Sequence, residues 1–131
     1  MALDFHPDAP QRPELTVAAG EQVADLVRYL NHATRPGAGG LEYPADAYAL
    51  LGSLSAAIGG LPQLLGQLSR FLTRLHADRL RDDHGGNTDE LVWMAHVQFG
   101  DANEHALRLM IALHAAQGAI AGLGVKGGGD A

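Results

Sequence analysis

The stretch IGGLPQLLG, residues 58–66, decides how the helical part of this chain is arranged. Two glycines and a proline within four residues are typical of a turn, yet strongly helical sequence lies on both sides. Apolar residues nevertheless step by three or four through the stretch without a change of phase: Leu51, Leu54, Ile58, Leu61, Leu65, Leu68, Leu72 and Leu75. Two helices joined by a turn have no reason to keep one heptad phase. We therefore expect one coiled-coil-like helix over residues 43–80, bent at Pro62.

The proline is the residue that makes a continuous helix energetically unfavourable. Pro62 has no backbone N–H, and its ring clashes with the carbonyl of Ile58, which costs roughly 3 kcal/mol in a plain helix interior. Packing of the leucine series must offset that cost. The alternative is a break into two shorter helices.

Two further helices are predicted on either side of the central one. The first covers residues 15–34 and ends at the RPGAGG segment, because proline and glycine forbid its continuation. The last begins after Gly85 and Gly86, with Asn87 or Thr88 as N-cap, and runs to about Leu123.

The expected fold is therefore all-α. A long antiparallel hairpin, with its first arm bent, is accompanied by a shorter N-terminal helix. Residues 1–14 are expected to form a flexible leader, residues 15–123 a single helical domain, and residues 124–131 a disordered glycine-rich tail.

Composition excludes several classes of function. The chain has 131 residues, a net charge of −6 and no cysteine, so disulfide scaffolds and thiolate metal sites are ruled out. It has no basic cluster, so no nucleic-acid partner is expected. The N-terminus lacks the basic and apolar regions of a signal peptide, and we expect a cytoplasmic protein.

The central helix has an unusual lack of charge. No Asp, Glu, Lys or Arg occurs from residue 47 to residue 69, a run of 23 positions. Its length raises the question of a membrane span, but the glutamines, serines, glycines and proline within it, and the acidic N-terminal flank, make a span unlikely. Burial by protein on nearly all sides is the better interpretation.

Small residues form a second line on this helix, because Gly52, Gly59 and Gly66 recur every seven positions. Such a line lets another helix backbone approach closely, although a glycine-rich composition alone gives the same pattern. One chain supplies too few neighbours to bury both this line and the leucine series, so we expect a homodimer or higher helical assembly. The predicted interface consists of Leu51, Gly52, Leu54, Ile58, Gly59, Leu61, Leu65, Gly66 and Leu68.

Candidate chemical sites are weak. Asp101 and His105 are spaced i, i+4 beside Glu104, an arrangement that can hold a divalent metal. A solvated helix face with an ion pair explains the same residues better, because no repeat of metal-binding motifs supports a site. No catalytic residue and no cofactor is expected.

Two groups of motifs carry a resemblance. One consists of LNHATRPGAGGLEYPADAYALLGSLSAAIGGLPQLLGQL at residues 30–68, and the other of AAQGAIAGL at residues 115–123. Together they resemble small uncharacterised all-α proteins of actinobacteria, often associated with conjugative or integrative elements. The resemblance spans most of the expected helical region, but its motifs are structural and imply no activity.

The sequence therefore favours a non-enzymatic interaction or assembly module, such as an accessory protein of a mobile element, with itself and an unknown protein as partners. One alternative is a metal-dependent helical-bundle enzyme that uses Asp101, Glu104 and His105. Another is an exported hairpin similar to those of type VII secretion, although the Trp-x-Gly turn of that class is missing.

Overall fold

The computed structural model describes residues 5–75 and 79–127, and these residues form helices and loops with no strand. The helices are α1 (Pro13–Ala33), α2 (Pro44–Gly59), α3 (Leu61–Leu75) and α4 (Thr88–Ile120). The all-α prediction is confirmed. The chain divides into two compact units, Met1–Glu42 and Tyr43–Ala131, and each unit is described by itself.

The first unit contains α1. Pro13 occupies the first turn, where its missing N–H costs nothing, so the helix begins two residues before the predicted start. It ends at Ala33, and the Thr34 hydroxyl donates to the Leu30 carbonyl at 2.8 Å. Gly37 and Gly39 then adopt φ of 79° and 81°, a conformation that disfavours other residues. The predicted stop in the RPGAGG segment is confirmed.

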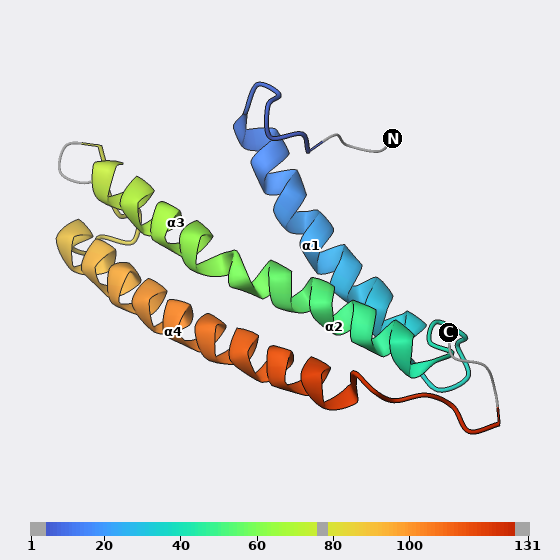
Figure 1. The fold of residues 1–131 in the computed structure, drawn as a ribbon. Helices are drawn as coiled ribbons and strands as arrows, with labels where there is room; N and C mark the ends of the chain where they lie inside the picture. The colour runs from blue at the N-terminus through green and yellow to red at the C-terminus, as the bar shows by residue number, and fades with distance from the viewer. Residues whose placement is uncertain (1–4, 76–78, 128–131) are drawn as a thin grey trace. The chain divides into compact units, whose positions relative to one another are not determined.

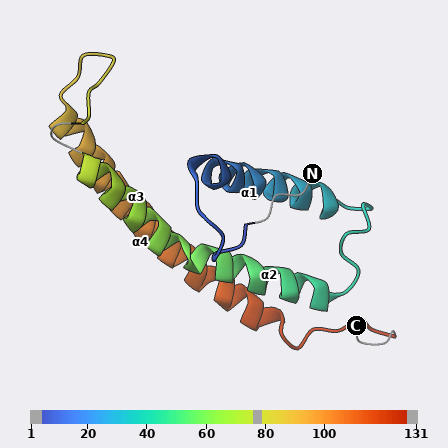
Figure 2. The ribbon, with the colours of Figure 1, turned by 90° about the horizontal axis from the view of Figure 1, so that it is seen from above.

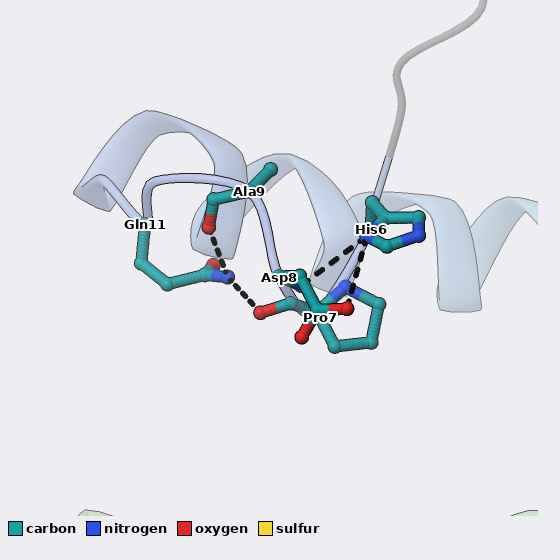
Figure 3. A network of polar contacts seen from close by, with 5 residues as sticks. All are labelled: His6, Pro7, Asp8, Ala9 and Gln11. Carbon is teal, nitrogen blue, oxygen red and sulfur yellow. Dashed lines mark hydrogen bonds and ion pairs between the residues drawn. The ribbon is translucent and has the colours of Figure 1, made fainter.

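A local turn precedes α1 (Figure 3). The Gln11 side-chain amide donates to the carbonyls of Pro7 and Ala9 at 3.1 and 2.9 Å, and the Asp8 N–H donates to Nδ1 of His6 at 3.2 Å. All these contacts are short-range, so they fix a turn within the predicted leader. Residues 1–4 of that leader, and residues 128–131 of the predicted tail, lie outside the described residues.

The second unit is an antiparallel hairpin. Both α2 and α3 pack along α4, so the first arm consists of two consecutive helices and the second arm of one. Figures 1 and 2 show α2 and α3 following α4 along its length from two directions. The predicted hairpin is confirmed.

The first arm is one bent helical path. Gly60 separates α2 from α3 but keeps right-handed helical dihedrals, with φ −84° and ψ −15°. Its N–H donates to the Ala57 carbonyl at 3.2 Å, and its own carbonyl accepts from Leu64 N–H at 3.4 Å. The backbone therefore bends at the glycine and proline without leaving the helical region, which explains why the heptad phase survives.

The end of this arm differs from the prediction. α3 ends at Leu75, residues 76–78 lie outside the described residues, and Arg79 and Leu80 are not helical. The predicted end at Leu80 is therefore too late. The apolar series with steps of three and four ends at Leu75 in the sequence, because Asp78 and Arg79 occupy the next two positions of the series, and Leu80 is five residues away.

The second arm begins at a well-formed cap. Oδ1 of Asn87 accepts hydrogen bonds from the N–H groups of Asp89 and Glu90 at 2.9 and 3.3 Å. In the preceding turn, Asp82 accepts from the N–H groups of His84 and Gly86 at 3.1 and 2.6 Å. Of the two predicted N-cap residues, Asn87 is therefore the cap, and Thr88 is the first residue of the helix. α4 ends at Ile120, three residues before the predicted end.

Replacing the capping side chain should weaken the hairpin. We expect Asn87→Ala to lower the free energy of unfolding by about 1 kcal/mol, because two N–H groups of the first turn lose their acceptor. Urea unfolding followed by circular dichroism measures the change. Asn87→Asp keeps an acceptor and is the matched control. An Asn87→Ala variant as stable as the control would contradict the capping role.

Candidate interaction surface

Small residues line the seam between the two arms of the hairpin. Among the described residues, only Ser55, Ser69 and Ala106 are buried, with 2%, 8% and 7% of their surface exposed. A Cβ atom added to Gly52 would lie 2.7 Å from Nε2 of Gln117, and one added to Gly59 would lie 2.9 Å from Sδ of Met110. Long side chains of α4 therefore lie over the glycines of α2, and the buried residues of the seam are small.

Polar contacts cross the same seam at both ends. Near the open end of the hairpin, the Gln117 amide donates to the Tyr48 carbonyl at 3.2 Å. On α3, Oγ of Ser69 and Nδ1 of His96 form a hydrogen bond of 2.9 Å. These bonds require α2–α3 and α4 to keep a fixed register, because a shift by one residue breaks both.

A small pocket of about 190 Å³ lies beside the Ser69–His96 bond. It is lined by Gly66, Ser69, His96, Phe99, Gly100 and Asn103. None of these residues is acidic, so no carboxylate orients the imidazole as in a Ser-His-Asp triad. Ser69 also lies within a helix, where backbone N–H groups are already hydrogen-bonded and cannot form an oxyanion hole. The pair is therefore a structural contact between the arms.

Two buried polar atoms in the hairpin have no hydrogen-bond partner within the protein, namely Oγ of Ser55 and Oδ1 of Asn103. Each such atom lowers stability by roughly 1–3 kcal/mol relative to a paired one. Apolar side chains of that size would avoid this cost. The close approach of the helices, rather than the strength of these polar groups, therefore holds the seam together.

The three predicted interface glycines have neighbours in the same chain. Gly52 and Gly59 lie against Gln117 and Met110 of α4, and Gly66 lines the pocket with residues of α4. Sequence reasoning assigned this line of glycines to contact with a second copy and missed its partner within the hairpin. Ala106, a small residue central in α4, was the available signal.

The remaining residues of the predicted interface are apolar and large. We call them the leucine face: Leu51, Leu54, Ile58, Leu61, Leu65 and Leu68. The first five are half-buried, and Leu68 is 42% exposed. Next to them, Leu64 and Phe71 are each 48% exposed. The hairpin therefore leaves a charge-free apolar surface incompletely covered.

The metal candidates are arranged as a helix surface. Nη2 of Arg108 donates to Oε1 of Glu104 at 2.8 Å, and both side chains are mostly exposed. Asp101 and His105 are exposed as well. Within residues 5–75 and 79–127, no group of three or more His, Cys, Asp or Glu side chains is placed to hold a metal ion.

The first arm also passes a simple test for a membrane span. By length and composition alone, the path Pro44–Leu75 is apolar enough to cross a bilayer, with a mean hydropathy of 1.4 in its most apolar window. Only 6% of that window is buried within the hairpin. A single segment of this kind is weak evidence, but it identifies the same surface as the leucine face.

Comparison of the chain with protein-family models, with curated proteins and with solved structures finds no match. The interaction surface is therefore interpreted from its own geometry.

The seam makes a specific prediction about Gly59. A leucine at this position would meet the Met110 sulfur, which belongs to a flexible side chain that can move, so we expect Gly59→Leu to lower the free energy of unfolding by about 1 kcal/mol at most. Adding Met110→Ala should restore part of the lost free energy of unfolding, because it removes the side chain that the new leucine contacts. Chemical unfolding of the single and double variants measures both effects.

Gly100 provides the control for this experiment. A Cβ atom there meets nothing within 4 Å, so Gly100→Leu should cost no comparable stability. The close approach at Gly59 is refuted if Gly59→Leu and Gly100→Leu are equally stable, or if Met110→Ala only adds to the loss.

Proposed function

We propose that the chain is a non-enzymatic interaction module that assembles as a homodimer through its leucine face. The observation that carries the proposal is the incomplete burial of a charge-free leucine series in a hairpin whose described residues include only three buried ones. Contiguous apolar surface of more than a few hundred Å² is rare on monomers and marks a contact surface.

Burial of this surface gives a sufficient driving force. Each Å² of apolar area removed from water contributes about 25 cal/mol, and association costs must then be subtracted. The large side chains of the hairpin are at most half-buried, so the hairpin alone obtains only part of this term. A second copy offers an equally apolar, uncharged face, and no acidic or basic group from residues 47–69 has to be desolvated.

The simplest arrangement is a twofold pair of hairpins. In such a pair the same face is used by both copies, and the two arms of each hairpin form a four-helix bundle. The heptad spacing of the leucine face suits side-chain interdigitation of this kind. The glycines of the seam keep their role within each hairpin, so only the leucine residues of the predicted interface are assigned to the contact.

A bilayer is the competing partner for the same apolar surface, and α4 argues against it. α4 packs along both α2 and α3, and it carries Asp101 and Glu104 near its middle. A hairpin inserted as a unit would bring these carboxylates into the hydrocarbon region, where each ionised group costs several kcal/mol. A second copy covers the leucine face without moving them from water.

The resemblance to actinobacterial proteins supports a biological role for the module. We propose an accessory role in a mobile element, in the cytoplasm. Neither the metal-dependent enzyme nor the exported hairpin is favoured by an observation on the described residues.

A charge on the leucine face should prevent assembly. Leu68 is 42% exposed, so Leu68→Glu is tolerated by the hairpin itself, but in a dimer it places a carboxylate in an apolar contact. Light scattering at low micromolar concentration should give twice 13.8 kDa for the unmodified chain and 13.8 kDa for the variant.

The neighbouring exposed residue supplies the control. Gln67→Glu adds the same charge one position away, outside the leucine face, and should leave the dimer intact. A mass of 13.8 kDa for the unmodified chain would contradict the proposed homodimer. Equal effects of Leu68→Glu and Gln67→Glu would show that the leucine face is not the contact.

A further inference from the structure

α4 has an apolar surface of its own, away from the seam. Trp93 and Ile111 are each 64% exposed, and Val97 and Leu107 are 40% and 43% exposed. Together with Gly100 and Glu104, they step by 4, 3, 4, 3 and 4 positions along the helix, which places them on one side. We call Trp93, Val97, Leu107 and Ile111 the outer stripe.

The outer stripe is distinct from both surfaces already described. At about 100° per residue, Ile111 lies about 140° around α4 from Ala106, the buried residue of this helix. The leucine face lies on α2 and α3, so it shares no residue with the outer stripe. The outer stripe is therefore defined without the proposed homodimer, and only the choice of its partner below rests on that proposal, which assigns the leucines of α3 to the homodimer contact.

Acidic residues border the outer stripe. Glu90 and Asp101 each lie three or four positions from a stripe residue and are therefore its neighbours on the helix surface, whereas Glu104 lies in line with the stripe, between Val97 and Leu107. Arg108 is the one basic residue in α4, and it is already paired with Glu104. A helix that lies in the stripe meets negative charge along its edge.

We propose that the outer stripe binds a basic amphipathic helix of a different protein. Charge disfavours a second α4, because acidic edges would face each other. α1 has three acidic residues, Glu14, Glu21 and Asp25, and one arginine, Arg28. α2 has Asp46 as its one charged residue. Neither helix is basic, so neither complements the acidic residues beside the stripe.

α3 is the one basic helix of the chain, through Arg70 and Arg74, but its Leu61, Leu65 and Leu68 belong to the leucine face. The complement to an acidic, apolar stripe is thus a helix with leucines flanked by lysine or arginine, supplied by another protein. Gly100 leaves room for one of its side chains, since a Cβ there meets nothing within 4 Å.

Trp93 makes this surface directly observable, because it is the chain's one tryptophan. The probes are two synthetic helical peptides of three heptads with identical leucines, one flanked by lysine and the other by glutamate. On titration into the full chain, the lysine peptide should shift Trp93 emission to shorter wavelength, with affinity falling as salt rises. The glutamate peptide should give no shift.

Variants of exposed residues test the contact. Ile111→Gln should weaken binding of the lysine peptide about tenfold or more, because an apolar anchor is lost. Replacing Asp101 and Glu104 together by lysine should reverse the preference between the peptides. Leu68→Glu, outside the stripe, should leave the affinity unchanged.

The proposal is overturned if the lysine peptide gives no shift, if both peptides bind equally, or if Ile111→Gln has no effect. Light scattering of the same Ile111→Gln protein should still give the mass of the unmodified chain. A dimeric chain that does not bind the lysine peptide would therefore contradict the outer-stripe proposal and leave the homodimer proposal unaffected. A monomeric chain that binds the lysine peptide would contradict the homodimer proposal alone.

Discussion

Packing of α2–α3 along α4 is the constraint on which the rest of the structure depends. The space beside Gly52 and Gly59 is taken up by the ends of the Gln117 and Met110 side chains of α4. The buried residues of this seam, Ser55, Ser69 and Ala106, are small. Larger side chains beside them, such as Ile58 and Phe99, are only partly covered.

The position of the leucines follows from this seam. In a hairpin held together by large side chains, the leucines would fill the space between the arms and leave polar residues outside. Here glycine, serine and alanine lie at the centre of the seam and larger side chains beside it are only partly covered, so the leucine face and the outer stripe remain partly in water. An arrangement of this kind leaves large apolar side chains where a partner can bury them, and this is the physical basis of the interaction module that we propose.

The bend has a corresponding role in the first arm. Gly60 and Pro62 interrupt the regular hydrogen bonding, yet the backbone dihedrals of Gly60 stay helical. Both segments therefore remain in contact with α4 on one continuous side. A true turn would have ended the seam at Gly59 and separated Ser55 from Ser69. The polar contacts of Gln117 with Tyr48 and of His96 with Ser69, one on each side of the bend, depend on that continuity.

The sequence by itself determined the helical class, the hairpin, the bend at Pro62, and a cap at Asn87 or Thr88, of which the structure has Asn87. Each of these depends on local chemistry: heptad phase, a missing N–H, or a side-chain acceptor next to exposed N–H groups. The end of the first arm was predicted too late, because Leu80 is not helical and lies outside the apolar series that ends at Leu75.

The partner of the glycine line was decided only by the tertiary structure. Periodicity shows that Gly52, Gly59 and Gly66 share one side of a helix, but it carries no information on which helix approaches them. That choice depends on the relative register and rotation of the two arms, which place Gln117 and Met110 opposite the glycines. The same rotation exposes Trp93 and Ile111, and a one-dimensional pattern cannot specify it, because α4 has apolar residues on more than one side.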